Sequence, residues 1–337
     1  MSEVFTAPPM VESFRGLLKA IDNRAVAVIG HARPDGDCIG SQVALARVLR
    51  SQGIDARCVN ADQVPRRLGF AANGENFTNV DGLGEFDGVA IYVDCADQDR
   101  PGPRLRARFP DVLGNIDHHV SNSRYAIHNC VSVTAAATCE ILGALFLDED
   151  LPIDAITAQA LYAGIVTDTG QFRFASTTRA TFQISAELMA RGANPVDAGF
   201  QLYEREPLGK TQLLQRFLAS FELHADNRIC LGTLASGVFA ETGTSPEDTE
   251  GLVDYARAID GVEIGGLIEV RPEGVKASLR TNDPLFRVDR IAAQFGGGGH
   301  ACAAGLSLTG IAPDEFRRKL VAALEQRLVE IDAVRER

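Results

Sequence analysis

The stretch Ala25-Val26-Ala27-Val28-Ile29-Gly30-His31-Ala32-Arg33-Pro34-Asp35-Gly36-Asp37 decides the fold class of this 337-residue chain. It joins an apolar run of the kind that forms a buried strand to a turn with one histidine and two aspartates. In parallel-sheet proteins, the ends of the strands converge on one edge of the sheet. We therefore expect the polar side chains of this turn to lie at such an edge.

Three further motifs follow apolar runs of the same kind: Val93-Asp94, Asp117-His118-His119 and Thr167-Asp168-Thr169-Gly170. Residues 88–93 and 112–116 are predicted strands, whereas the run before the last motif also fits a helix over 156–166. Carboxylates and imidazoles gathered in one crevice would repel one another unless cations lay between them. The four motifs together predict a metal cluster.

The alternation of strand-like and helix-like segments from residue 25 to about 188 predicts a doubly wound, parallel-sheet α/β domain. We assign this domain to residues 1–190, connecting helices to 191–224, and a smaller α+β domain to 225–337. The first domain is expected to contain a strand at 26–29 and helices at 39–51 and 135–147. The second is expected to contain strands at 229–234, 262–270 and 275–280 and helices at 247–258, 288–295 and 313–337.

Composition excludes several classes of protein. The net charge of −12 argues against binding long duplex nucleic acid, because phosphate backbones require clustered Lys and Arg. No uninterrupted apolar run reaches the ~18 residues that span a bilayer, and no secretory signal is visible, so we expect a cytoplasmic protein without a membrane partner. A phosphate-binding loop is also a poor fit, because Glu204 replaces the first glycine that Gly209-Lys210-Thr211 would need.

The candidate metal ligands are His31, Asp35, Asp37, Asp94, His118 and Asp168. An oxygen-rich set with two imidazoles suits Mn²⁺ or Mg²⁺ better than Zn²⁺. Four negative charges balance two divalent ions, and ions roughly 3.5–4 Å apart can clamp the attacking and leaving oxygens of a phosphoester. Each residue taken singly is better explained as a helix cap or a turn residue. Their concentration in four motifs favours the metal site.

A second candidate site is the glycine-rich stretch Gly296-Gly297-Gly298-Gly299-His300. It forms either a sharp turn after a helix, or a nest in which His300 and the bare amides of Gly297, Gly298 and Gly299 bind a phosphate or a sugar. Arg280 would supply the positive charge that such a nest lacks, unless it is an ordinary surface arginine.

The four motifs in this order, together with Ser278-Leu279-Arg280 and the glycine-rich stretch, resemble the DHH phosphoesterases and their DHH-associated C-terminal domain. The family is named for the triad seen here as Asp117-His118-His119, and the likeness covers about residues 26–308. The resemblance implies two manganese ions, with magnesium as the alternative. One ion would be held by His31, Asp35 and Asp94, and the other by Asp37, Asp94, His118 and Asp168, with Asp94 bridging.

The resemblance also implies that His119 faces the substrate and either stabilises the phosphate or protonates the leaving group. Arg280 and His300, with the glycines beside them, would bind the far phosphate or the nucleotide. Arg173 would add a phosphate contact or serve as a structural arginine.

Within the family, the compact length resembles the hydrolases of short oligoribonucleotides that also remove the 3′-phosphate of adenosine 3′,5′-bisphosphate. We expect Mn²⁺-dependent cleavage of RNA of two to five nucleotides to 5′-mononucleotides, and conversion of the bisphosphate to AMP. A phosphodiesterase for cyclic di-AMP or its linear product, a pyrophosphatase-type relative and a nucleotide sensor without catalysis remain alternatives. The oligomeric state, with a homodimer among the options, stays open.

Overall fold

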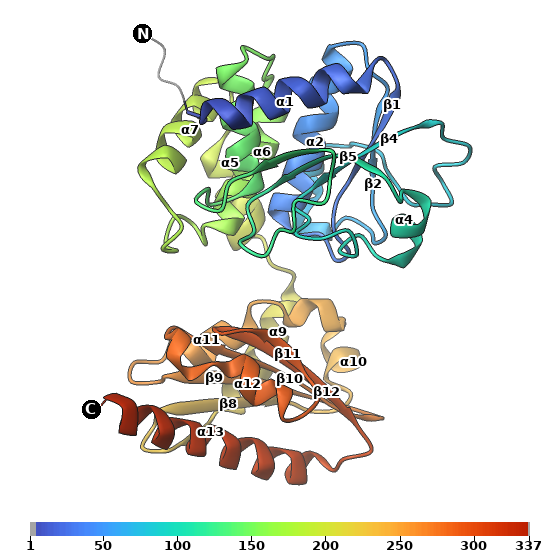
Figure 1. Cartoon of the computed structure of the whole chain (residues 1–337). Helices are drawn as coiled ribbons and strands as arrows, with labels where there is room; N and C mark the ends of the chain where they lie inside the picture. Colours follow the sequence, from blue (N-terminus) through green and yellow to red (C-terminus); the bar gives the residue numbers. More distant parts are fainter. Residues whose placement is uncertain (1–4, 336–337) are drawn as a thin grey trace. The chain divides into compact units, whose positions relative to one another are not determined.

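The computed structural model describes residues 5–335 and divides into two compact units, Met1–Arg205 and Glu206–Arg337 (Figure 1). Each unit has a six-stranded sheet, and each of its hydrophobic core clusters lies within that unit. The first unit is a doubly wound α/β fold and the second combines a mixed sheet with helices. The predicted fold class is confirmed.

The sheet of the first unit is entirely parallel, with the strand order β3-β2-β1-β4-β5-β6. The chain begins in the centre, moves outward to β3, and returns to pair β4 with the other side of β1. Where the order reverses, the loops that leave the two neighbouring strands run in opposite directions and open a crevice. The strands are β1 Ala25–Ile29, β2 Ala56–Val59, β3 Phe77–Thr78, β4 Gly88–Val93, β5 Val112–Asp117 and β6 His128–Val131.

The first unit also contains helices that lie beside this sheet (Figure 1). They are α1 Pro8–Ile21, α2 Gly36–Ser51, α3 Gly69–Ala72, α4 Pro103–Arg108, α5 Thr138–Asp148, α6 Ala155–Asp168 and α7 Arg179–Ala190. The helix α1, whose Phe14, Leu17 and Ile21 are fully buried in the core, is not among the predicted elements. The run that precedes Asp168 is the helix α6, so the strand considered for it is wrong and the helix is confirmed.

Glycines allow α2, α5 and α6 to approach one another closely. A Cβ atom on Gly40 would lie 2.4 Å from the carbonyl oxygen of Ala160, and one on Gly164 would lie 2.3 Å from the Sγ atom of Cys139. No real side chain fits at such distances, so only glycine permits this spacing. The consequence is that the ends of three helices converge on one small volume beside the sheet.

The sheet of the second unit has the order β11-β12-β10-β9-β8-β7, in which only β8 and β9 pair in parallel. Side chains of β8 alternate between two cores: Ile229 and Leu231 face the core that α12 and α13 join, and Cys230 and Leu234 face the core of α9 and α11. The strands are β7 Glu222–His224, β8 Ile229–Leu234, β9 Ile264–Arg271, β10 Gly274–Thr281, β11 Gly298–His300 and β12 Ala303–Thr309. The helices are α9 Leu208–Ala219, α10 Val238–Thr242, α11 Leu252–Arg257, α12 Val288–Ala293 and α13 Pro313–Arg335.

Two predicted segments differ in detail from the structure. The helix expected at 247–258 is split into a 3₁₀ turn, Pro246–Thr249, and α11, because Gly251 adopts a left-handed conformation with φ 82° between them. The glycine-rich stretch ends in the edge strand β11 rather than in a loop. The segment before β7 contains α8 Pro195–Gly199, a π-helix Phe200–Glu204 and α9. The last two residues of the helix predicted at 313–337 lie outside the described residues.

Candidate active site

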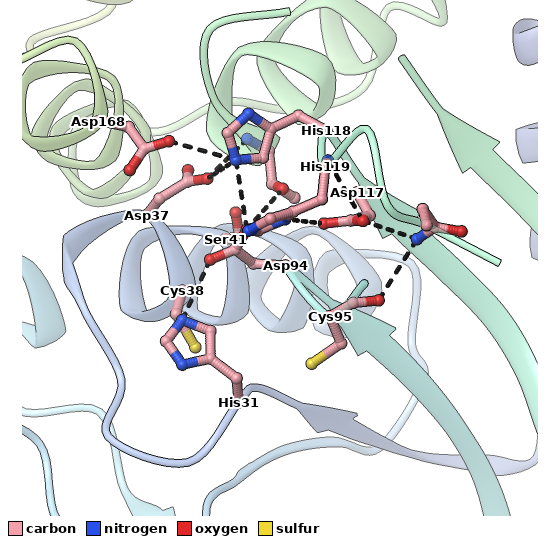
Figure 2. Close-up of polar contacts among 12 residues, drawn as sticks. His31, Asp37, Cys38, Ser41, Asp94, Cys95, Asp117, His118, His119 and Asp168 are labelled. Atoms are coloured by element: carbon pink, nitrogen blue, oxygen red, sulfur yellow. Dashed lines mark hydrogen bonds and ion pairs between the residues drawn. The ribbon is translucent and has the colours of Figure 1, made fainter. Parts of the chain in front are cut away.

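The side chains predicted as metal ligands converge where the strand order reverses between β1 and β4, and Figure 2 shows five of them, His31, Asp37, Asp94, His118 and Asp168. They come from five places in the fold: the ends of β1, β4 and β5, the first turn of α2, and the last residue of α6. Within this cluster, Asp37 and Asp168 point toward the ring of His118 (Figure 2). The structure thus brings together His31, Asp35, Asp37, Asp94, His118 and Asp168.

Asp94 lies in the centre of the cluster. One of its oxygens, Oδ2, lies 3.2 Å from Nε2 of His31, and the other, Oδ1, lies 3.6 Å from Nε2 of His118. Within the part of the chain that the structure describes, three groups have ligand atoms that all lie within 4.8 Å of one another. They are His31, Asp35 and Asp94; Asp37, His118 and Asp168; and Asp94, His118 and His119. The two oxygens of one carboxylate therefore face two different candidate ion positions.

The protonation of His31 tests whether a cation fits here. Its Nδ1 atom lies 2.9 Å from the carbonyl oxygen of Ala32, and because a carbonyl only accepts, Nδ1 carries the proton. Among the described residues, the buried Nε2 atom has no hydrogen-bond partner beyond the carboxylates that it faces, those of Asp35 at 3.7 Å and Asp94 at 3.2 Å. Burial alone would lower the pKa of His31, but Cys38, Asp35 and Asp94 outweigh it and raise that pKa, so without metal a second proton on Nε2 faces the two carboxylates. A metal cation bound there would take the place of this proton. This arrangement is the one that a divalent metal ion requires of a histidine ligand.

Asp37 is fully buried and is oriented by the start of α5. The backbone amides of Thr138 and Cys139 donate to its two oxygens at 2.7 and 2.8 Å. Burial, followed by the charge of Asp94, raises the pKa of Asp37 to about 7. Burial and the neighbouring carboxylates of Asp37 and Asp94 likewise raise the pKa of Asp168 well above its ordinary value. The crowding is the electrostatic situation that bound cations relieve.

Asp117, the first residue of the triad, does not face the candidate ions but orients His119. Its Oδ1 atom accepts a hydrogen bond from Nδ1 of His119 at 2.8 Å, and Oδ2 accepts one from Asn122 at 2.6 Å. Burial alone would raise the pKa of Asp117, but the hydrogen bond and charge of His119, together with the hydrogen bond from Asn122, outweigh burial and lower that pKa. The same hydrogen bond raises the pKa of His119, which favours its protonated form.

Two residues that hold the cluster together, Asp117 and Thr138, are not among the predicted site residues. The hydroxyl of Thr138 donates to Oδ1 of Asp94 at 3.2 Å, in addition to the bond from its amide to Asp37. The position of Asp117 two residues before His119 is a weak signal of a supporting role. Nothing in the local sequence distinguishes Thr138, because its partners lie more than 40 residues away along the chain.

The predicted substrate-binding residues lie in both units. Arg173 is exposed in the loop after Asp168, and its Nε atom donates to the carbonyl oxygen of Gly170 at 2.7 Å. In the second unit, Arg280 of β10 and His300 of β11 both pair with Ala303 of β12, so they lie at one register position on one face of the sheet. Gly297, Gly298 and Gly299 are also predicted to contact the substrate. Gly298 and Gly299 belong to the edge strand β11 and are exposed, as is His300, and Gly297 directly precedes this strand.

Among residues 5–335, no helix has the length and apolar composition that crossing a membrane would take.

Comparison with known proteins agrees with this architecture. Residues 25–165 match the N-terminal domain of the DHH family, and residues 231–330 match the DHHA1 domain. The bifunctional oligoribonuclease and PAP phosphatase NrnA of Thermus thermophilus is 30% identical over 312 residues, which cover 93% of this chain and 92% of that relative. The chain therefore belongs to the DHH family of phosphoesterases. As a member, it is a hydrolase that acts on phosphoester bonds.

Two further similarities extend over most of the chain. The Bacillus subtilis protein of the same name is 26% identical over 284 residues, covering 82% of this chain and 87% of that relative. The crystal structure of an exopolyphosphatase-related protein from Bacteroides fragilis superimposes with a TM-score of 0.85 at 24% identity, covering 95% of this chain and 96% of the other. At that identity, the structural likeness shows the shared fold.

Proposed function

We propose that this protein is a Mn²⁺-dependent phosphodiesterase of very short oligoribonucleotides that also converts adenosine 3′,5′-bisphosphate to AMP. The observation that carries the proposal is the position of Asp94, whose two oxygens face His31 on one side and His118 on the other. Relatives that match more than four fifths of the chain are named for both activities, which supports this choice of substrates.

Two divalent ions fit the ligand set. His31, Asp35 and Asp94 would hold one, and Asp37, Asp94, His118 and Asp168 would hold the other. Bound there, the ions would polarise the phosphoryl group and make water a better nucleophile. The ligand set contains both carboxylates and imidazoles. It favours Mn²⁺ over Mg²⁺, because Mg²⁺ prefers ligands that are all oxygen atoms.

The remaining steps, orientation of the ligands and protonation of the leaving group, depend on side chains and backbone amides of the protein. Asp117 keeps a proton on Nδ1 of His119, which directs the opposite nitrogen, Nε2, to the substrate. Because this hydrogen bond raises the pKa of His119, the ring can donate a proton from Nε2 to the leaving oxygen. The backbone amides at the start of α5 hold Asp37 in place, so that the carboxylates do not rotate during turnover.

The choice of short substrates follows from charge. A protein with a net charge of −12 attracts a polyanion only where cations are concentrated locally. In the second unit, Arg280 and His300 share one register position beside exposed backbone of β11, and we assign to them and to Gly297–Gly299 the binding of a terminal phosphate. Arg173 would add a contact beside the metal ligands.

The test is product formation by metal-stripped protein with and without Mn²⁺, from 5′-labelled diadenylate, adenosine 3′,5′-bisphosphate, cyclic di-AMP and pyrophosphate. We expect Mn²⁺-dependent release of AMP from the first two, with cyclic di-AMP left intact. Preferential hydrolysis of cyclic di-AMP would indicate a cyclic di-AMP phosphodiesterase instead. Equal turnover of pyrophosphate and diadenylate would favour a pyrophosphatase, and tight nucleotide binding without hydrolysis would favour a sensor.

A further inference from the structure

The loop that follows Asp168 holds one aromatic ring exposed beside the candidate active site. Phe174 is 53% exposed, although it belongs to a unit that buries most of its large apolar side chains. Its ring covers Gly170: a Cβ atom on that glycine would lie 2.4 Å from Cζ of the ring. One side of the ring therefore packs against the backbone of Gly170, which is itself buried, while the ring as a whole stays half-exposed.

The backbone of this loop is strained but well fixed. Gln171 and Phe172 adopt left-handed conformations, with φ of 63° and 62°, which cost energy for any residue except glycine. The amides of Arg173 and Phe174 donate to the carbonyl oxygen of Thr169 at 2.9 and 3.0 Å, and the amide of Phe172 donates to the Thr169 hydroxyl at 3.0 Å. Strain of this kind persists where the surrounding structure enforces it, and it is concentrated at functional sites.

The place of the ring limits what it can bind. Gly170 lies two residues after the candidate ligand Asp168, a span of at most about 7 Å along the chain. Arg173, which directly precedes Phe174 in the sequence, is also exposed. A planar apolar surface and a positive charge therefore lie together beside the cluster. A nucleotide has the matching chemistry, because it joins a planar aromatic base to a phosphate. Base stacking on aromatic side chains is a general mode of binding single-stranded nucleic acid.

We propose that Phe174 is a stacking platform for the nucleobase of the nucleotide whose phosphate lies at the metal-ligand cluster. This inference rests on the proposed function and adds to it how the substrate is oriented. Every base has an aromatic face, so the platform selects nucleotides over simple phosphoesters without choosing among the four bases. Phe174 is a positioning residue, and its removal should affect only substrates that carry a base.

The test compares diadenylate with its abasic analogue, in which hydrogen replaces both bases, on wild-type protein, Phe174→Ala and Phe174→Tyr. We expect Phe174→Ala to lower kcat/KM for diadenylate about 10-fold, which corresponds to ~1.4 kcal/mol and lies within the range measured for base stacking. Wild-type protein and Phe174→Ala should cleave the abasic analogue equally well. Phe174→Tyr should cleave diadenylate as well as wild-type protein does.

Phe200→Ala is the matched control, because Phe200 is 47% exposed in the same unit. An equal loss on both substrates in Phe174→Ala, or the same selective loss in Phe200→Ala, would overturn the assignment. Binding of a dinucleotide that contains 2-aminopurine gives a readout without turnover, since stacking quenches its fluorescence. If wild-type protein cleaves neither substrate, the proposed function fails, while quenching that Phe174→Ala abolishes would still support the platform and unchanged quenching would refute it.

Discussion

Asp94 occupies a position that few residue types can fill. Its backbone is left-handed with φ 57°, a conformation that aspartate and asparagine tolerate better than most residues, and its side chain serves both halves of the ligand cluster. The amide of Asn keeps the shape and the backbone preference but removes the charge. Asp94→Asn therefore tests the charge alone.

We expect Asp94→Asn to lower kcat by at least about 100-fold, since even the outer partners of metal ligands contribute 10- to 100-fold. The metal-free variant should unfold at the same temperature as wild-type protein or higher, because one of several crowded carboxylates is gone. Steady-state kinetics with Mn²⁺ and thermal unfolding without metal check the two statements. Retention of wild-type turnover would contradict the two-ion site.

Asp117 allows a separate prediction, because it contacts His119 and not the candidate ions. Asp117→Asn removes the charge that raises the pKa of His119, and it leaves an uncharged side chain of the same size. We expect kcat to fall about 10- to 100-fold while KM changes little. The exposed Asp111→Asn serves as the control and should retain full activity. A change in KM alone would show that Asp117 supports binding instead.

The site residues that could be predicted differ from the others in how far along the chain their interaction partners lie. His31 and Asp94 were found because each follows an apolar strand, and strand ends in a parallel sheet share an edge. Thr138 and Phe174 act through a neighbour in space or through a strained loop, and local sequence carries no sign of either. The same limit hid the role of Asp117, although the residue itself was quoted in a motif.

At the level of the elements, glycine spacing between helices sets the geometry of the cluster. A Cβ atom on Gly164 would lie 2.3 Å from Sγ of Cys139 and 3.1 Å from Cα of Asp37. Gly164→Ala would force α6 away from α2 and α5, and overpacking of this kind costs ~1–3 kcal/mol. We expect a lower free energy of unfolding and weaker Mn²⁺ binding, measured by denaturant titration and calorimetry. Gly199→Ala, where nothing lies within 4 Å of the added carbon, should leave both unchanged or slightly increase stability.

The start of α6 predicts a dependence on pH. Asp154 accepts a hydrogen bond from the Thr157 amide at 2.8 Å and pairs with Arg47. Burial raises the pKa of Asp154, but the bonds from Arg47 and Thr157 outweigh it and lower the pKa to about 2. Asp154→Ala should cost ~1 kcal/mol at neutral pH, the usual value for a helix cap.

The sign of this pH dependence follows from the depressed pKa in the folded state. The contribution of Asp154 is complete above the ordinary aspartate pKa of about 4 and is lost as the pH falls toward 2. We therefore expect the difference in free energy of unfolding between wild-type protein and Asp154→Ala to become smaller as the pH falls. Chemical denaturation of both proteins at pH 7, 4 and 3 measures this difference. The exposed Asp87→Ala is the control, and a difference that is constant with pH would contradict the role of the carboxylate.

Strands with strong apolar patterns were predictable from sequence, while segments that depend on a partner were not. The predicted strands 88–93 and 229–234 have the bounds that the structure gives to β4 and β8. By contrast, β11 consists of two glycines and a histidine, a composition with no strand preference, and it forms because β12 supplies its hydrogen bonds. The helix α1 carries only three fully buried residues, and its amphipathic pattern was overlooked.

For the whole molecule, the separate cores of the two units predict separate unfolding transitions. All candidate metal ligands lie in the first unit, so Mn²⁺ should stabilise only its transition. At 100 times the dissociation constant, binding contributes about 2.7 kcal/mol, which raises the unfolding temperature of a unit of this size by about 5–10 °C. Differential scanning calorimetry with and without Mn²⁺ measures the shift, and Asp94→Asn should reduce it. A single transition that moves as a whole would contradict independent unfolding.

The division of the chain between Arg205 and Glu206 also bears on how such enzymes diversify. Each core cluster belongs to one unit, so a recombination event at this junction would exchange the second unit without leaving a core half-filled. The residues proposed to bind a terminal phosphate would be replaced together, and the candidate metal ligands would be inherited unchanged. A lineage built in this way can acquire new substrates by shuffling gene segments, while the ligand cluster is kept by selection on a separate stretch of DNA.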